Sequence, residues 1–537
     1  MKRLFQIFVL TILCTTFSCV DLEEEPINQL RTNYFESFGS LRAAVNGTYT
    51  VLISDVWERS IQVGSFRVPQ MGADDFTTLT GSNKEEWRQF DQFYQSSGNT
   101  RLQRSTWALL YDVIRQASWD IEGAASLEGI VNQEAIDQTV AESYFLRAWC
   151  YFWLVRTFGE VPIITSTVVN DDIYDVERQS VALVYEQILA DLDFAIEHLP
   201  EIQSDYGYVN KWAAKAYLAE VHLTMAGWPL NQTEHYAIAR DISRDVIQNS
   251  SYQLMDDFAS IFQPENEGNE ELIWSISLCP IDACGGGYTG SWTAKATKPA
   301  ELNGYQDMYI ELSFFERFPE GARKDFTMLS NLKVETGNPA DPSYIRRVDG
   351  LEDKEIFYNY IDYTQFTTGH PYLKKYWGGF YDTTLVADDP AQPVDPQSPM
   401  DIPMMRLAKV YLMYAEAQAR ADGSPSAESF EFLNQIRRRG KGYPIDSVGT
   451  EVDILPGTLG TDDFVRAVVD EKGWELVGEL NRWFDLVRTE RVEEVNALRS
   501  PLEPLPIQNT ITKQYYIAPI PATEIAINPR LTQNPGY

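Results

Sequence analysis

The sequence predicts a mostly α-helical protein in which helix pairs stack on one another and a long irregular segment interrupts the array. Amphipathic stretches with apolar residues at helical spacing recur before and after the middle of the chain. Between residues 254 and 400 this periodicity is lost, and Gly, Pro and aromatic residues surround a few short strand-like runs. With 537 residues, 44% of them hydrophobic, the chain is long enough to bury a large core.

Residues 141–162 are predicted to form the central helix. Gly159 ends this helix, and Pro162 prevents it from resuming. Its broad apolar stripe is formed by Phe145, Leu146, Trp149, Tyr151, Phe152 and Val155. A helix with so wide an apolar face needs packing partners on more than one side. Cys150, within the same helix, is expected to be a small buried hydrophobic residue.

The other helices are predicted from the same spacing and form pairs on the scale of tetratricopeptide repeats, although the consensus of that repeat is degenerate here. They cover residues 41–53, 105–125, 181–199, 210–226, 236–248, 403–421, 427–439, 461–477 and 480–488. Residues 64–98 are expected to be irregular, 271–278 to form a strand, and 516–537 to be extended. Insertions into repeat arrays map to one face, often the binding face, so segment 254–400 is expected to carry ligand-binding loops.

The first 18 residues have the pattern of a bacterial lipoprotein signal. Lys2 and Arg3 precede the apolar run 4–13, which is too short to cross a bilayer, and Cys19 follows small residues. Cys19 is therefore predicted to be the acylated first residue of the mature chain, and ordinary secretion with cleavage nearby is the alternative. The predicted divisions are a signal peptide at 1–18, helical regions at 19–253 and 401–537, and the insertion at 254–400.

The charge balance excludes some partners. The chain has 78 acidic and 44 basic residues, a net charge of −34. A field of that sign repels nucleic acid and anionic lipid, and it suits a neutral or cationic ligand.

Catalytic and cofactor motifs are weak. None of the four histidines forms H-E-x-x-H, and the G-x-G-x-x-G match at 285–290 precedes no apolar helical period, so it is interpreted as a loop. The acidic pairs Asp74–Asp75 and Asp388–Asp389 could serve a glycosidase, but a solvated surface is the favoured interpretation. Cys279 and Cys284 could form a disulfide, and a second cysteine pair for zinc is missing. No cofactor is predicted.

Several segments in order resemble the SusD/RagB family of outer-membrane lipoproteins of Bacteroidetes. The similar segments are 146–162, 402–417, 434–440, 475–488 and the ending 519–537, which is the most specific of them. Lys409 departs from the family pattern, because a Glu is usual at that position.

This resemblance implies a tetratricopeptide-like scaffold with an irregular ligand-binding region. It also implies a non-catalytic, lipid-anchored outer-membrane protein that captures an oligosaccharide for a SusC-like TonB-dependent transporter. A peptide ligand, a surface glycoside hydrolase with a carboxylate pair, and a pure protein scaffold are the alternatives.

The ligand site is predicted in two irregular segments, because sugars are bound by exposed flat rings flanked by carboxylates. The first segment contains Asp74, Asp75 and Trp87, and the second contains Tyr288, Trp292 and Tyr305. The resemblance implies that aromatic residues of an early loop and of the middle insertion together form the ligand surface. The alternative is that these rings pack the insertion against the helices. The later cluster Tyr372, Tyr376, Trp377 and Tyr381 is expected to pack, as is Trp483.

Overall fold

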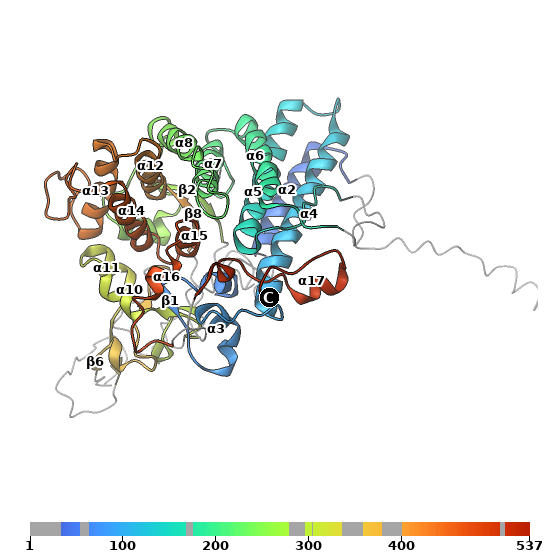
Figure 1. Cartoon of the computed structure of the whole chain (residues 1–537). Coiled ribbons are helices and arrows are strands. Elements are labelled where there is room, and N and C mark those ends of the chain that lie inside the picture. Colours follow the sequence, from blue (N-terminus) through green and yellow to red (C-terminus); the bar gives the residue numbers. More distant parts are fainter. Residues whose placement is uncertain are drawn as a thin grey trace, which may run out of the picture.

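In the computed structural model, the described residues are 34–53, 64–167, 176–203, 205–278, 296–302, 304–335, 358–377, 400–504 and 511–537. Figure 1 shows two adjoining stacks of helices and, beside them, a third region of short helices, short strands and irregular segments. The two Cys residues 279 and 284, the loop 285–290 and Cys19 lie outside the described residues.

The first stack consists of α2 (Phe38–Ile53), α4 (Leu109–Ala124), α5 (Gln133–Phe158) and α6 (Val181–His198). The second stack consists of α7 (Lys211–Met225), α8 (His235–Asn249), α12 (Leu407–Ala421), α13 (Ala427–Lys441) and α14 (Thr461–Glu475). Because α8 packs against α12, the second stack joins the two halves of the sequence across the irregular insertion. Among the described residues, no helix is both long and apolar enough to span a bilayer.

Shorter elements form the third region and the chain's end. The short helices are α3 (Glu85–Asp91), α10 (Leu312–Arg317), α11 (Ala322–Thr327), α15 (Arg482–Arg488), α16 (Val492–Asn496) and α17 (Ala522–Ile527). The strands are β1 (Phe76–Thr77), β2 (Leu272–Ile276), β3 (Tyr309–Ile310), β4 (Met328–Leu329), β5 (Asn331–Glu335), β6 (Tyr358–Asp362), β7 (Tyr372–Leu373) and β8 (Ile402–Arg406). They pair antiparallel as β1–β3, β2–β8, β4–β7 and β5–β6.

The long helices begin and end at the residues that their capping chemistry favours. The side chain of Asn132 accepts a hydrogen bond from the backbone amide of Glu134 at the start of α5. Gly159 ends the helix with φ of 72°, a conformation that a residue with a Cβ rarely adopts. Ser180 and Asn210 cap α6 and α7 in the same way as Asn132.

The central helix α5 is buried on nearly every side, rather than along one stripe. Its interior charges are therefore paired: Arg147 donates to Asp191 at 2.7 and 2.9 Å, and Glu142 accepts from Arg42 at 2.6 and 3.0 Å. Buried charges are tolerated only when they are paired and hydrogen-bonded. Cys150 is buried among the apolar residues of the same helix, as predicted.

The predicted helix 403–421 is wrong at its start, because Ile402–Arg406 form strand β8 and the helix begins at Leu407. The strand pairs with β2 in the predicted strand region, with Ile276 opposite Ile402. Lys409, despite departing from the family pattern, forms an ion pair of 2.7 Å with Glu220.

The last described segment, residues 511–537, returns to the first stack and contacts the end of α5. It is not extended throughout as predicted, since it contains α17. The side-chain amide of Asn534 donates to the carbonyl oxygens of Phe158 and Ala518 at 2.9 and 2.7 Å. The backbone amide of Ala518 donates to the carbonyl of Thr157 at 2.7 Å. Carbonyl groups at the end of α5 are thus satisfied by the end of the chain.

Candidate functional site

The early and middle irregular segments lie against each other in the structure. β1 pairs with β3, with Phe76 opposite Ile310. Lys84 forms an ion pair with Asp307, and the hydroxyl of Thr78 donates to the carbonyl of Asp307 at 2.7 Å. Segments that are far apart in the sequence therefore form one surface of the third region.

Trp87 is not on that surface, and the expectation that its ring is exposed is wrong. Only 2% of the residue is accessible, and the Arg101 guanidinium lies 4.0 Å from the ring centroid. Trp87 and Phe90 are three residues apart on α3, so both side chains lie on the buried face of this short helix. The ring packs the early segment onto the core.

Asp74 and Asp75 are also buried, which corrects both their predicted exposure and the interpretation as a solvated acidic surface. Arg482 donates two hydrogen bonds to Asp74, at 2.7 and 3.0 Å, and Arg317 donates one at 2.9 Å. Burial by itself raises the pKa of Asp74, but these two guanidiniums outweigh it and lower the pKa to about 2. Asp74 connects the early segment to α15 and α10.

Asp75 has the opposite electrostatics. Burial, followed by the neighbouring charge of Asp74, raises the pKa of Asp75 to about 7. Two neighbouring carboxyl groups, one with a raised pKa and one with a lowered pKa, are typical of the acid and its partner in a glycosidase. However, the cavity beside Asp75 and Trp483 measures only about 10 Å³. That volume holds about one water molecule and no sugar ring, so this pair does not meet a glycan.

Among the predicted ligand-binding residues that the structure describes, Tyr305 has the expected exposed ring, since 42% of the residue is accessible. Its loop is held on several sides. The side chain of Glu301 accepts hydrogen bonds of 2.8 Å from the amide and the hydroxyl of Thr367. The Lys298 ammonium lies 5.2 Å from the ring centroid of Trp377. A firmly held loop with an exposed ring suits the stacking of an apolar sugar face.

Gly304 allows the backbone of this loop to pass close to Lys298, and the sequence prediction did not include this residue. A Cβ at Gly304 would lie 2.1 Å from the carbonyl oxygen of Lys298, so only glycine fits there. A glycine directly before the predicted aromatic residue was the available signal. Of the other predicted residues, Tyr288 and Trp292 lie outside the described part of the chain, as do Asp388, Asp389 and Tyr381. Tyr372, Tyr376, Trp377 and Trp483 are buried, as predicted.

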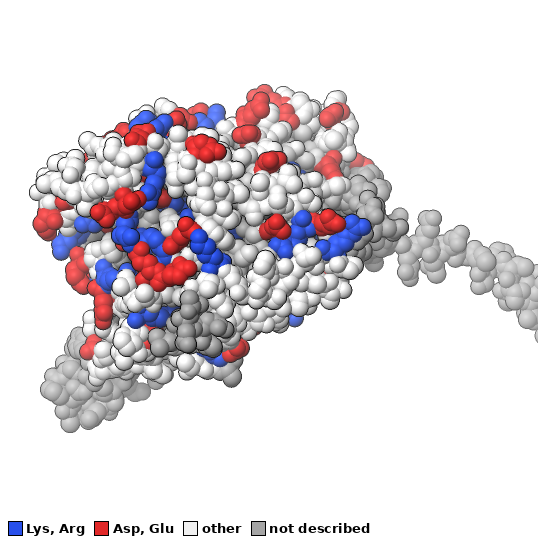
Figure 2. Space-filling view, viewed as in Figure 1, with Lys and Arg blue, Asp and Glu red and all other residues white. Residues whose placement is uncertain are grey.

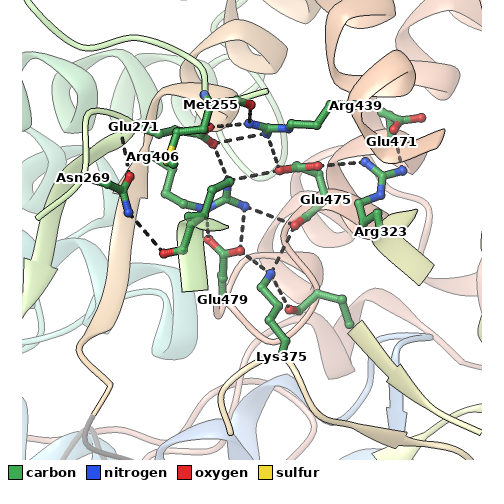
Figure 3. Close-up of polar contacts among 12 residues, drawn as sticks. Met255, Asn269, Glu271, Arg323, Lys375, Arg406, Arg439, Glu471, Glu475 and Glu479 are labelled. Atoms are coloured by element: carbon green, nitrogen blue, oxygen red, sulfur yellow. Dashed lines mark hydrogen bonds and ion pairs between the residues drawn. The ribbon is translucent and has the colours of Figure 1, made fainter. Parts of the chain in front are cut away.

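A buried network of charges fixes this third region to the helices (Figure 3). Arg406 at the end of β8 donates to Glu271 at 2.7 Å, to Glu475 at 3.0 Å and to Glu479 at 2.7 and 2.8 Å. Arg323 of α11 joins it through Glu475 at 2.8 Å. Lys375, which follows β7, forms an ion pair with Glu479.

The network is structural rather than catalytic. Burial raises the pKa of Glu475, but Arg439, Arg406 and Arg323 outweigh it and hold the pKa well below its usual range. A carboxylate saturated by guanidiniums accepts no proton near neutral pH and has no lone pair free for a substrate. On the outer surface, Figure 2 shows acidic and basic side chains interleaved on the visible face, with no continuous basic patch there.

Two family models match this chain, and they match opposite ends of it. The model described as "SusD family" matches residues 322–537, and the model described as "Starch-binding associating with outer membrane" matches residues 22–223. SusD-like protein P25 of Formosa agariphila is 26% identical over 553 residues, which cover 98% of this chain and 98% of that protein.

Solved structures share the fold along nearly the whole chain. A SusD superfamily protein from Parabacteroides distasonis superposes with a TM-score of 0.73 at 24% identity, covering 95% of this chain and 100% of that one. A laminarin-binding SusD-like protein gives a TM-score of 0.69 at 23% identity, with 93% and 99% covered. These likenesses confirm the predicted fold class, mostly helical with few short strands.

Proposed function

The chain belongs to the SusD family of non-catalytic, outer-membrane-associated binding proteins, and from this premise we propose that it binds an oligosaccharide and delivers it to a SusC-like TonB-dependent transporter. The observation that carries the proposal is the match of two family models to opposite ends of the chain. The description of one model as starch-binding and the name of the laminarin-binding neighbour favour a glycan as the ligand.

The proposed ligand surface is the outer side of the third region around Tyr305, to which Tyr288 and Trp292 belong as further proposed rings. The firmly held loop of Tyr305 supports this placement, because a rigid ring loses little entropy when a sugar stacks on it. Asp74, through Arg317, and the backbone carbonyl of Asp75, through the amide of Glu311, connect the early segment to the middle segment, and Trp87 is buried. We also propose that the mature chain is anchored by lipid on Cys19.

Calorimetry with maltohexaose and laminarihexaose tests the binding function. The unaltered protein is expected to bind at least one of them, and Tyr305→Ala is expected to weaken that binding roughly tenfold, the scale of one aromatic contact. Tyr206→Ala is the control, because Tyr206 is 46% exposed, follows α6 and has its hydroxyl near Glu267 rather than on the loop of Tyr305. Equal affinity of the Tyr305 and Tyr206 variants, at unchanged thermal stability, would place the site elsewhere.

The same samples separate the alternatives. Cleavage of the oligosaccharide during incubation would indicate a hydrolase, and binding of a peptide mixture without binding of either glucan would indicate a peptide-binding member of the family. Delivery is tested by mild detergent extraction of native membranes. If the tagged protein retains no TonB-dependent transporter, the delivery step is wrong.

A further inference from the structure

A second pocket lies in the third region, between α10, α11 and the strands that follow them. Its volume is about 330 Å³, within the range of small-ligand sites. Phe315, Lys324, Asp325, Ser330, Asn331 and Lys374 are among the residues that line it. With Glu320 and Met328, which complete the lining, the pocket is built from an aromatic ring, a thioether, two amines, two carboxylates, a hydroxyl and an amide.

Lys374 is the unusual member of this lining. Within the described residues its ammonium has neither a hydrogen-bond partner nor an ion pair, although the residue is half-buried. Other buried lysines in this acidic chain are paired: Lys409 with Glu220 at 2.7 Å and Lys472 with Asp485 at 2.8 Å. In a chain with 78 acidic residues, a half-buried amine that forms no ion pair is a position at which the anionic group of a ligand can bind.

The other cation of the pocket is already neutralised. Lys324 forms an ion pair of 2.6 Å with Glu320 and lies 4.2 Å from the ring centroid of Phe315. Burial lowers the pKa of Lys374, while the nearby Asp325 raises it. Asp325 is itself exposed and carries an acceptor that a sugar hydroxyl can use. The pocket therefore offers the Lys374 amine, which has no ion pair but has the exposed Asp325 nearby, beside hydroxyl-binding groups and a ring.

We propose that this pocket binds an anionic sugar residue of the ligand, a uronate or a sulfate ester, with Lys374 as the counter-ion. The inference rests on the proposed oligosaccharide binding, and it specifies that the bound oligosaccharide carries a charged substituent. The net charge of −34 disfavours anions at long range, so an anionic ligand needs a local cation of this kind. The ring of Phe315, which meets Tyr363 edge-on at 5.2 Å, provides a fixed wall for the sugar.

Saturation-transfer NMR with three matched probes tests the proposal: D-glucuronate, glucose 6-sulfate and glucose. At least one anionic probe is expected to receive saturation more strongly than glucose, and its signal should weaken with added salt. Lys374→Gln is expected to reduce that signal roughly tenfold, on the scale of a charge-assisted contact, while Lys374→Arg retains most of it. Which probe responds distinguishes a uronate from a sulfate ester.

The matched control is Lys513→Gln, which removes the same charge from an exposed lysine paired with Glu490, away from the pocket lining. Equal signals from glucose and both anionic probes would overturn the proposal, as would anionic signals that survive Lys374→Gln. Neither result affects the neutral glucans measured with Tyr305→Ala, so failure of this inference and failure of the proposed function are separate outcomes.

Discussion

At the scale of single residues, two neighbouring aspartates are held in opposite ionisation states. Arg482 and Arg317 keep Asp74 ionised against the effect of burial, whereas burial and the charge of Asp74 raise the pKa of Asp75 to about 7. An unfolded aspartate titrates near 4. Between about pH 4 and pH 7, the folded protein therefore keeps a proton on Asp75 that the unfolded chain has already lost. The contribution of Asp75 to stability is present below pH 4 and is lost as pH rises through 7.

Asp75→Asn is expected to stabilise the protein at pH 8 and to have little effect at pH 4. The substitution removes a buried charge that forms only above neutrality, so the gain at pH 8 is at most about 4 kcal/mol, the free energy of a three-unit shift. Urea unfolding of both proteins at the two pH values measures the difference. An equal gain in the free energy of unfolding at pH 4 and pH 8 would show that the pKa of Asp75 is not raised.

The predicted exposure of the candidate rings is confirmed for Tyr305 and wrong for Trp87, in both cases for physical reasons. Tyr305 was predicted because an aromatic residue in a Gly- and Pro-rich segment is often exposed. Trp87 was misjudged because polar residues around it concealed a short helix, although the spacing to Phe90 was visible. Lys374 had no sequence signal, because burial without an ion pair is a property of its neighbours in space.

At the scale of elements, the end of β8 carries one fully buried charged side chain, that of Arg406. Arg406→Met is expected to destabilise the protein by about 3–5 kcal/mol, because Glu271, Glu475 and Glu479 would lose a fully buried partner. Chemical unfolding measures the loss.

Arg420→Met is the control, since its ion pair with Asp462 is partly exposed. It should cost less than about 1 kcal/mol. Similar losses for the two variants would mean that the buried network contributes no more than a surface pair.

Helices were predictable where local chemistry decides them. The helix predicted at 181–199 is observed as Val181–His198, between Ser180 and Pro200. The start of the helix after residue 402 was wrong, because Pro403 suits the first turn of a helix as well as a strand. Its conformation is fixed by pairing with β2, more than a hundred residues away in the sequence, and no local pattern records that partner.

At the scale of the whole molecule, the proposed lipid on Cys19 makes attachment to the membrane depend on one residue near the start of the chain. Cys19→Ala is expected to release the protein from the outer membrane without changing its fold, because the substitution removes the sulfur that would carry the proposed lipid. Fatty-acid labelling and membrane fractionation measure this. A variant that still incorporates fatty acid, or that stays in the membrane fraction, would contradict the proposed anchor.

The other end of the chain has a consequence for the order of synthesis. The carbonyl of Phe158 receives its bond from Asn534, 376 residues later. The last turn of the central helix is therefore complete only after the ribosome has added Asn534. A chain released early, even by only the few residues from Asn534 onward, leaves that turn with an unbonded carbonyl beside the core. The C-terminal end of α5 therefore gains this hydrogen bond only in a chain that extends at least to Asn534.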